Sequence, residues 1–241
     1  MILDGKKIAE DILAEIGDAL RGKKLGIVVG SQDPATESFV RIKTRIASRL
    51  GVEVVHGELS ELVQSCDGII VQLPIENAEG LLARLPGDKD VDAMGPAPRV
   101  RPPVAGAVAE ILMRHRVDVS GKKAVVVGAG RLVGQPCAAL LRELGAGVSI
   151  VTSKKGSLDE LKTADIVVLG AGEPGLIKPE MLKEGVTLID AGTSEAGGKL
   201  AGDADPVCAE VASIFTPVPG GIGPIAVAMI FKNLLELSRQ K

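Results

Sequence analysis

The segment Ala124-Val-Val-Val-Gly-Ala-Gly-Arg-Leu-Val-Gly134 runs from a short apolar stretch directly into closely spaced glycines. The apolar residues are typical of a buried parallel strand, and residues 132–144 continue with helical spacing. In a strand–turn–helix unit, glycines permit a tight turn and let backbone N–H groups approach a pyrophosphate. The segment therefore predicts a dinucleotide site at Gly128, Gly130 and Gly134. Its spacing is GxGxxxG rather than GxGxxG, and a purely structural glycine turn is the alternative.

The end of the next apolar strand indicates which dinucleotide is bound. In a NAD site, an Asp or Glu about 20 residues further along holds the free ribose hydroxyl. Here the strand ends in Thr152-Ser-Lys-Lys155, and the next acidic residue is Asp159. A hydroxyl and two ammonium groups suit a 2′-phosphate, so the sequence favours NADP over NAD. The alternative is a solvated lysine pair on a loop.

Outward from this segment, short apolar strands alternate with helices. Strands are predicted at 25–30, 52–55, 68–73, 124–128, 148–152, 165–169 and 187–190, and helices at about 6–21, 37–50, 104–116 and 132–144. This alternation is typical of the α/β class. We predict an N-terminal α/β domain, residues 1–118, and a C-terminal Rossmann-type doubly wound parallel sheet, residues 119–215. The last helix, 224–241, is expected to return to the N-terminal domain.

Composition excludes several classes of protein. The 241 residues carry a net charge of −3 and include three Phe but no Trp or Tyr. Neither nucleic acid nor an anionic membrane is therefore expected as a partner. Pro and Gly interrupt the uncharged stretch 211–231, which argues against a membrane span. Three distant cysteines and the absence of a secretory signal favour a cytoplasmic protein with neither disulfides nor a metal site.

Candidate chemistry in the first domain centres on Lys43. Phe39, Lys43, Ile46 and Leu50 form one stripe of a predicted helix. The lysine either snorkels to water or faces a cleft, where desolvation would let it act as an acid or base. Gln72 ends a strand, where open α/β sheets place ligands, although an edge amide is equally compatible.

Two further patterns carry no chemistry of their own. Asp88, Asp90 and Asp92 alternate, but the loop lacks the glycine and the bidentate glutamate of a calcium site. His56 and His115 have no Ser or Cys partner in a motif, so a hydrolase triad is not expected.

The motifs gain specificity from their order along the chain. They are Ser38-Phe-Val-x-x-Lys43, Val71-Gln-Leu-Pro74, Lys89-Asp-Val-Asp92, Gly121-Lys-x-x-Val-Val-Val-Gly128 with Val133-Gly-x-Pro136, Ile189-Asp-x-Gly192, and Thr216-Pro-Val-Pro-Gly-Gly-Ile-Gly-Pro224. With this order the chain resembles, nearly end to end, the bifunctional methylenetetrahydrofolate dehydrogenase/methenyltetrahydrofolate cyclohydrolase family.

The resemblance implies an enzyme of one-carbon metabolism, with folate chemistry in a cleft between the domains. It would oxidise 5,10-methylenetetrahydrofolate with NADP, or alternatively with NAD, and hydrolyse the methenyl product to 10-formyltetrahydrofolate. A homodimer and tetrahydrofolate derivatives as partners are also implied.

The same resemblance assigns roles to individual residues. Lys43 is the central catalytic residue, Gln72 orients it, and Asp92 holds the pterin-like ring. The remaining assigned residues bind the folate (Phe39, Gly223, Pro224) or the cofactor (Gly128, Gly130, Arg131, Gly134, Ser153, Lys154, Thr193).

Two alternatives remain open. The family normally has Tyr where this chain has Phe39, and two regions, around 56–66 and 95–101, are shorter than usual. These departures favour a dehydrogenase alone, acting on a folate or on a methanopterin-type pterin. A non-catalytic nucleotide-sensing domain is the alternative from another class. The joint presence of Lys43, Gln72 and Asp92 argues against it.

Overall fold

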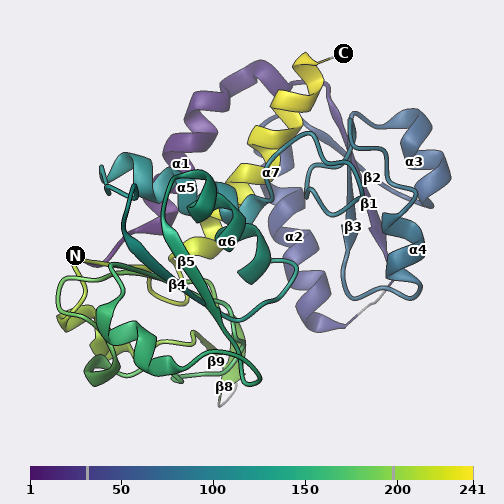
Figure 1. The fold of residues 1–241 in the computed structure, drawn as a ribbon. Coiled ribbons are helices and arrows are strands. Elements are labelled where there is room, and N and C mark those ends of the chain that lie inside the picture. The colour runs from purple at the N-terminus through teal and green to yellow at the C-terminus, as the bar shows by residue number, and fades with distance from the viewer. Residues whose placement is uncertain (31–32, 197–198, 241) are drawn as a thin grey trace. The chain divides into compact units, whose positions relative to one another are not determined.

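Helices and parallel strands alternate along residues 1–30, 33–196 and 199–240, the part described by this computed structural model (Figure 1). The first half contains α1 (Gly5–Ile16), β1 (Lys24–Val29), α2 (Pro34–Arg49), β2 (Glu53–His56), α3 (Leu59–Ser65), β3 (Gly68–Gln72), α4 (Ala78–Leu82) and α5 (Pro103–Arg114). The second half contains β4 (Lys123–Val127), α6 (Gly134–Glu143), β5 (Gly147–Val151), β6 (Ile166–Leu169), β7 (Thr187–Asp190), β8 (Ser194–Ala196), β9 (Lys199–Ala201), β10 (Ile214–Phe215) and α7 (Ile222–Arg239). Short 3-10 helices span Gly17–Leu20, Leu158–Thr163, Pro179–Met181 and Pro206–Glu210.

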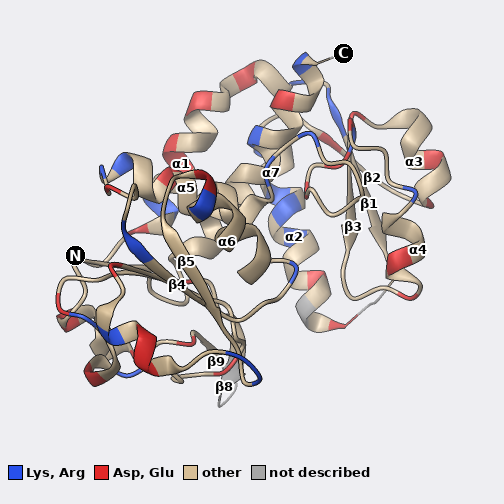
Figure 2. Ribbon diagram, viewed as in Figure 1, with Lys and Arg blue, Asp and Glu red and all other residues tan. Residues whose placement is uncertain are grey.

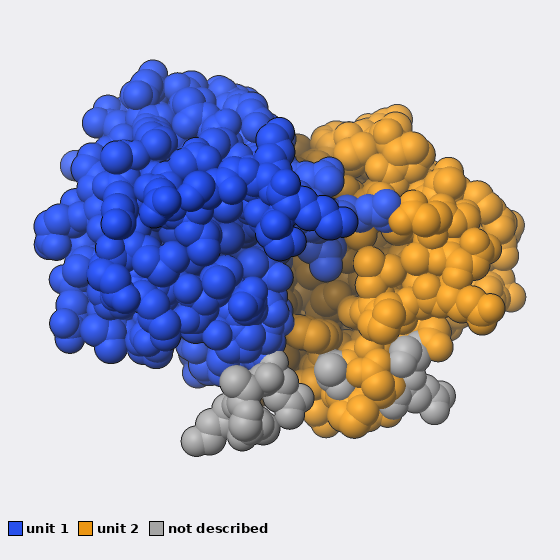
Figure 3. All heavy atoms as spheres, turned by 60° about the horizontal axis from the view of Figure 1, so that its bottom comes forward, with its two compact units in different colours: residues 1–9, 104–226 blue, residues 10–103, 227–241 orange. Residues whose placement is uncertain are grey.

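The chain divides into two compact units, which Figure 3 shows in different colours. Unit 1 comprises residues 1–9 and 104–226, and unit 2 comprises residues 10–103 and 227–241. The last helix, from Val227 on, thus packs with the first part of the chain, as the fold prediction expected.

The units differ from the predicted domain limits at both ends of the first segment. Residues 1–9 and 104–118 lie in unit 1 instead of with the rest of 1–118. For the N-terminus the reason is strand pairing: Ile2 forms a parallel bridge with Phe215, and the Leu3 amide donates to the Phe215 carbonyl at 2.9 Å. The division into functional domains at 118/119 stays a prediction.

Unit 1 contains the predicted Rossmann-type sheet. Five parallel strands lie in the order β10-β7-β6-β4-β5. Residues 124–127 of β4 are almost completely buried, as expected for a parallel sheet covered on both faces. The register pairs Val127 with both Val151 and Leu169, and Leu169 with Asp190. The carboxyl ends of these strands therefore meet at one edge of the sheet, and the α/β fold class is confirmed.

Unit 2 contains a smaller parallel sheet in the order β2-β1-β3. Helix α2 is capped by Asp33, whose carboxylate accepts the Thr36 amide at 2.9 Å, and it begins at Pro34. The register places Val29 opposite Gln72, so β1 and β3 end together. The start of α2, which follows β1, and the end of β3 therefore belong to the same edge of this sheet.

Several elements differ from the sequence-based expectations. The first helix ends at Ile16 instead of about residue 21, because Gly17 has a φ of +52° and a 3-10 turn follows. The short helices α3 and α4, the antiparallel pair of strands β8 and β9, and the two-residue strand β10 were not predicted. All four are too short for a hydrophobic period to develop.

Charged side chains lie mainly on helices and loops, and the strands of both sheets are largely uncharged (Figure 2). Within the described ranges, no helix has the length and apolarity that a bilayer crossing requires.

Candidate active site and dinucleotide site

A buried hydrogen bond joins α2 to the end of β3. Lys43 lies in the third turn of α2, and its side chain is directed inward rather than to water, since the residue is only 8% exposed. Its Nζ donates to Oε1 of Gln72 at 2.9 Å, and Gln72 is equally buried. The Gln72 Nε2 donates to the Leu73 carbonyl at 2.8 Å. This second bond fixes the amide so that its oxygen faces the ammonium group.

Asp92 lies within electrostatic reach of the same ammonium group. Burial raises the pKa of the Asp92 carboxyl, and the positive charge of Lys43 offsets part of that rise. The preceding segment runs beside β3, because the Ile69 amide donates to the Lys89 carbonyl at 2.6 Å. Lys43, Gln72 and Asp92 are thus brought together in unit 2 from a helix, a strand and a loop.

Helix α7 holds the loop that carries Asp92. Asn233 is 2% exposed, and its Nδ2 donates to the carbonyls of Val91 at 2.8 Å and Arg101 at 2.9 Å. One side chain therefore fastens the loop beside both of its ends. The sequence analysis missed Asn233; a single amide inside the apolar stretch Ile230-Phe-Lys-Asn-Leu-Leu235 was the available signal.

The neighbouring Asp90 shapes the same loop. It is fully buried, and its Oδ2 accepts the Gly95 amide at 2.6 Å. Burial raises the pKa of the Asp90 carboxyl.

Among the described residues, no group of three or more His, Cys, Asp or Glu side chains is arranged to hold a metal ion.

The residues assigned to folate binding are divided between the units. Phe39 precedes Lys43 by one turn of α2 and is 48% exposed, so its ring is available to a ligand but offers no hydroxyl. Gly223 and Pro224 lie in the first turn of α7, in the part that belongs to unit 1. Gly223 is exposed, and a Cβ there would meet no atom within 4 Å. A common site for all three residues stays a prediction.

The glycine loop, Gly128–Gly134, connects β4 to α6 in unit 1. Gly128 has a φ of +101°, and a Cβ there would lie 2.3 Å from the Gly170 oxygen. A Cβ on Gly134 would lie 2.1 Å from the Gly128 oxygen. A Cβ on Gly130, in contrast, would meet no protein atom within 4 Å.

This geometry fits a dinucleotide. The space over Gly130 is open to a ligand, and α6 begins at Gly134 without a side-chain cap from Val133. The positive end of the α6 dipole therefore faces this space and favours a pyrophosphate, although in the first turn the Gln135 amide already donates to the Gly130 carbonyl at 3.1 Å and Pro136 has no N–H.

The turn after β5 presents the residues assigned to the 2′-phosphate. The Thr152 amide donates to the Lys155 carbonyl at 2.7 Å, and the Lys155 amide donates back at 3.2 Å. Ser153, Lys154 and Lys155 are exposed on this turn, and within the described part of the chain neither ammonium has an ion-pair partner.

The two other residues assigned to the cofactor are also exposed in unit 1. Arg131 lies in the glycine loop, and Thr193 lies just after β7. Both therefore belong to segments that follow the carboxyl ends of strands.

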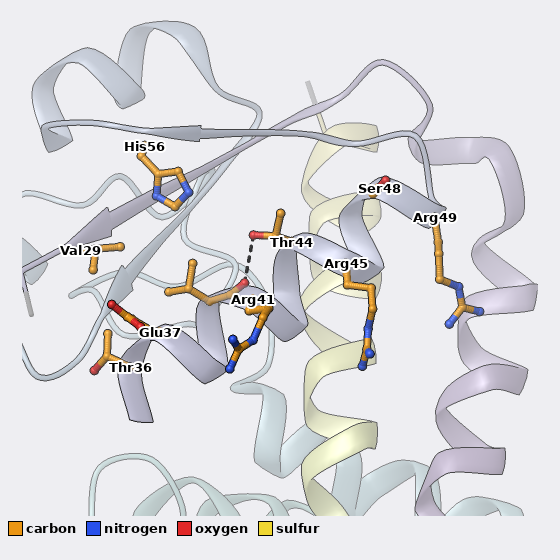
Figure 4. A pocket seen from close by; sticks show the side chains of 10 residues that line it. Val29, Thr36, Glu37, Arg41, Thr44, Arg45, Ser48, Arg49 and His56 are labelled. Atoms are coloured by element: carbon orange, nitrogen blue, oxygen red, sulfur yellow. Dashed lines mark hydrogen bonds between the residues drawn. The ribbon is translucent and has the colours of Figure 1, made fainter. Parts of the chain in front are cut away.

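A separate cavity of about 680 Å³ lies on another face of α2. Arg41, Arg45 and Arg49 extend from the same side of the helix there, with His56 opposite (Figure 4). Lys43 does not line this cavity, and we therefore assign the cavity no part in the Lys43 site.

Comparison with known proteins identifies relatives over the whole chain. Residues 102–241 match the family model "Tetrahydrofolate dehydrogenase/cyclohydrolase, NAD(P)-binding domain". The chain is 36% identical to a Lactobacillus delbrueckii protein named "Bifunctional protein FolD" over 277 aligned positions, which cover 100% of this chain and 98% of the relative. The aligned stretch is longer than the chain, so the relative carries segments that this chain lacks.

Solved structures agree with this match. The bifunctional methylenetetrahydrofolate dehydrogenase/cyclohydrolase from Campylobacter jejuni superimposes with a TM-score of 0.92 at 28% identity, covering 100% of this chain and 99% of that one. The corresponding Trypanosoma brucei enzyme, solved with NADP and an inhibitor, gives a TM-score of 0.92 at 30% identity, with 100% and 97% covered.

Two alanine substitutions should distinguish a glycine that the fold requires, Gly134, from a glycine that ligand binding requires, Gly130. Gly134→Ala places a methyl group against backbone, so we expect a loss of about 1–3 kcal/mol in the free energy of unfolding. Gly130→Ala should melt like the wild type but bind NADP at least about tenfold more weakly, because the methyl occupies space left for the ligand. Thermal denaturation and calorimetric titration measure the two effects. Unchanged NADP affinity in Gly130→Ala would contradict the assignment of the loop.

Proposed function

Because this chain belongs to the tetrahydrofolate dehydrogenase/cyclohydrolase family, we propose that it oxidises 5,10-methylenetetrahydrofolate with NADP and hydrolyses the methenyl product to 10-formyltetrahydrofolate. The observation that carries the proposal is the buried Lys43–Gln72 hydrogen bond beside Asp92. The chain is thus an oxidoreductase and a hydrolase of one-carbon metabolism, and its substrates are tetrahydrofolate derivatives.

The dehydrogenase step requires binding and orientation from the protein. When bound, NADP supplies the acceptor for the hydride that leaves the methylene carbon. The positive end of the α6 dipole and the open space over Gly130 suit its pyrophosphate. Ser153 and Lys154, exposed on the turn after β5, suit its 2′-phosphate. Hydride transfer itself needs no protein base.

The cyclohydrolase step requires a group that accepts and donates protons. Attack of water on the methenyl carbon releases one proton and gives a tetrahedral intermediate with a hydroxyl group. As the bond to the ring nitrogen breaks, that hydroxyl loses its proton to become the formyl C=O and the ring nitrogen takes up a proton, so that hydrolysis releases one proton overall. Lys43 is the group we assign to moving it, with Gln72 holding Nζ in place at 2.9 Å. As an ammonium in a largely water-excluded position, Lys43 also stabilises charge that develops in the tetrahedral intermediate. Asp92 is assigned to the N–H groups of the pterin-like ring.

A dehydrogenase without cyclohydrolase activity is the second candidate function, and Phe39 is the residue that favours it. Phe39 lies one turn from Lys43 and is exposed, yet it cannot donate or accept a proton. Water and Lys43 must then carry the proton without help from a tyrosine hydroxyl. A folate or a methanopterin-type pterin would serve as the substrate of such an enzyme.

We further propose that the protein works as a cytoplasmic homodimer. The family resemblance supports the dimer, and light scattering in solution tests it. All three cysteines are buried as free thiols, which supports a reducing compartment. Burial also raises the pKa of the Cys137 thiol to about 12, which makes it unreactive.

The two activities should respond differently to the loss of Lys43. With methylenetetrahydrofolate and NADP, we expect the wild type to form reduced cofactor, measured by absorbance at about 340 nm. In Lys43→Met, hydrolysis of added methenyltetrahydrofolate should fall about 100-fold or more, because the proton carrier is gone. The dehydrogenase rate should fall much less. Equal losses in both assays would contradict the role assigned to Lys43, and a wild type inactive in both would overturn the proposed function.

The preference for NADP should depend on the turn after β5. We expect the Lys154→Ala/Lys155→Ala double variant to bind NADP roughly tenfold or more weakly, since two charges facing the 2′-phosphate are removed. Affinity for NAD should stay within about twofold, because NAD lacks that phosphate. Lys122→Ala serves as the control, because Lys122 precedes β4 at the opposite edge of the sheet. Parallel losses for NADP and NAD would count against the assignment.

A further inference from the structure

Two buried aspartates in unit 1 have no role in the site described above. Asp190 ends β7 and is 1% exposed, and Asp203 follows β9 and is fully buried. Across the residues described, neither has a lysine or arginine as an ion-pair partner. Burial, with a contribution from the Asp203 charge, raises the pKa of Asp190 to about 6. Buried carboxylates without a cation require hydrogen-bond donors, and here the backbone supplies them.

The Asp203 carboxylate binds three successive amides of the loop after β6. Its Oδ2 accepts the N–H of Ala171 at 2.6 Å and of Gly172 at 3.2 Å, and its Oδ1 accepts the N–H of Glu173 at 2.8 Å. Successive N–H groups of this kind form a concavity that binds anions. In this chain the concavity is filled by the chain's own carboxylate, so the loop has one defined conformation.

Asp190 holds the segment that carries Asp203. Its Oδ1 accepts the N–H of Gly192 at 2.9 Å and of Asp203 at 3.3 Å, and its Oδ2 accepts the N–H of Ala204 at 2.9 Å. The two carboxylates together link the segments after β6, β7 and β9.

Two glycines make room for these carboxylates. A Cβ on Gly192 would lie 2.2 Å from Cγ of Asp203, and a Cβ on Gly202 would lie 2.2 Å from Oδ2 of Asp190. Each carboxylate therefore lies directly against the backbone of a glycine. Any other residue at Gly192 or Gly202 would displace the carboxylate with its Cβ. This close fit gives the pair a fixed geometry.

The loop held by Asp203 packs directly on the glycine loop. Its first residue is Gly170, whose oxygen would lie 2.3 Å from a Cβ on Gly128. A Cβ on Gly170 would in turn lie 2.4 Å from Cγ1 of Val133, the residue before α6. A shift of residues 170–173 would therefore displace the glycine loop at both of its ends, Gly128 and Val133.

From these contacts we infer that Asp203, held in place by Asp190, is a positioning residue for dinucleotide binding. It fixes residues 170–173 as a wall against Gly128 and Val133, so that the glycine loop keeps the shape that receives the pyrophosphate. Asp203 does not touch the dinucleotide; it acts through the loop. The inference rests on the proposed function only in taking NADP as the ligand.

The test compares Asp203→Ala and Asp203→Asn with the wild type in the full-length protein. In Asp203→Ala, the three amides lose their acceptor, so we expect the Kd for NADP, measured by calorimetry, to rise roughly tenfold or more. Hydrogen exchange at residues 171–173 should accelerate by at least about tenfold. Asp203→Asn keeps one carbonyl oxygen and should fall between the wild type and Asp203→Ala in both measurements. Hydrolysis of methenyltetrahydrofolate without dinucleotide should be unchanged, because Lys43, Gln72 and Asp92 lie in unit 2 and Asp203 contacts none of the residues assigned to folate.

Asp205→Asn is the matched control. Asp205 lies two residues along the same segment, but it caps the Val207 amide and pairs with Lys178 instead of binding the loop after β6. We expect its NADP affinity and its exchange at 171–173 to equal those of the wild type.

Three outcomes would overturn the inference. They are an unchanged Kd for NADP in Asp203→Ala, an equal loss in Asp205→Asn, and a parallel loss of hydrolysis and cooperative melting in both Asp203 variants. The last would show that Asp203 supports the fold as a whole. If the wild type binds NADP but catalyses neither reaction, the proposed function fails while the affinity comparison still decides the role of Asp203.

Discussion

Burial of the Lys43 ammonium is the constraint on which the arrangement of unit 2 depends. An ammonium removed from water costs several kcal/mol unless its protons are accepted and its charge is balanced. The Gln72 Oε1 accepts one hydrogen bond from Nζ, and the Lys43 charge offsets part of the rise that burial causes in the pKa of the Asp92 carboxyl. Lys43 and Gln72 are therefore held by elements of regular structure, α2 and β3.

The third member of that group is held less directly. Asp92 follows no regular element, and its loop is fastened by the Asn233 amide on α7 and by the Asp90 carboxylate within the loop itself. Buried polar groups of this kind specify one conformation for a segment that lacks its own secondary structure. The shape of the loop thus depends on a residue 142 positions away in the chain.

The sequence alone allowed the sheet of unit 1 and the glycine loop to be foreseen, because each has a local signature. Strand β4 is a run of valines, and Gly128 and Gly134 occupy positions that permit no side chain. The pairing of Lys43 with Gln72 was expected only from the family resemblance, since the two residues are 29 positions apart. The roles of Asn233 and Asp203 had no such signature. Their partners are backbone groups distant in sequence, and backbone groups leave no trace in residue identity. The grouping of residues 1–9 with unit 1 was missed for the same reason, since it follows from main-chain pairing with Phe215.

The distribution of unit 2 along the chain has a consequence for its synthesis. Residues 10–103 leave the ribosome well before the helix that carries Asn233 is made. Until then the carbonyls of Val91 and Arg101 lack their donor, and the loop that carries Asp92 is held by the Asp90 carboxylate without the Asn233 amide. The Lys43 site is therefore completed only after α7 has been made, and a chain cut short before α7 would contain the whole glycine loop but lack the residue that fastens the Asp92 loop.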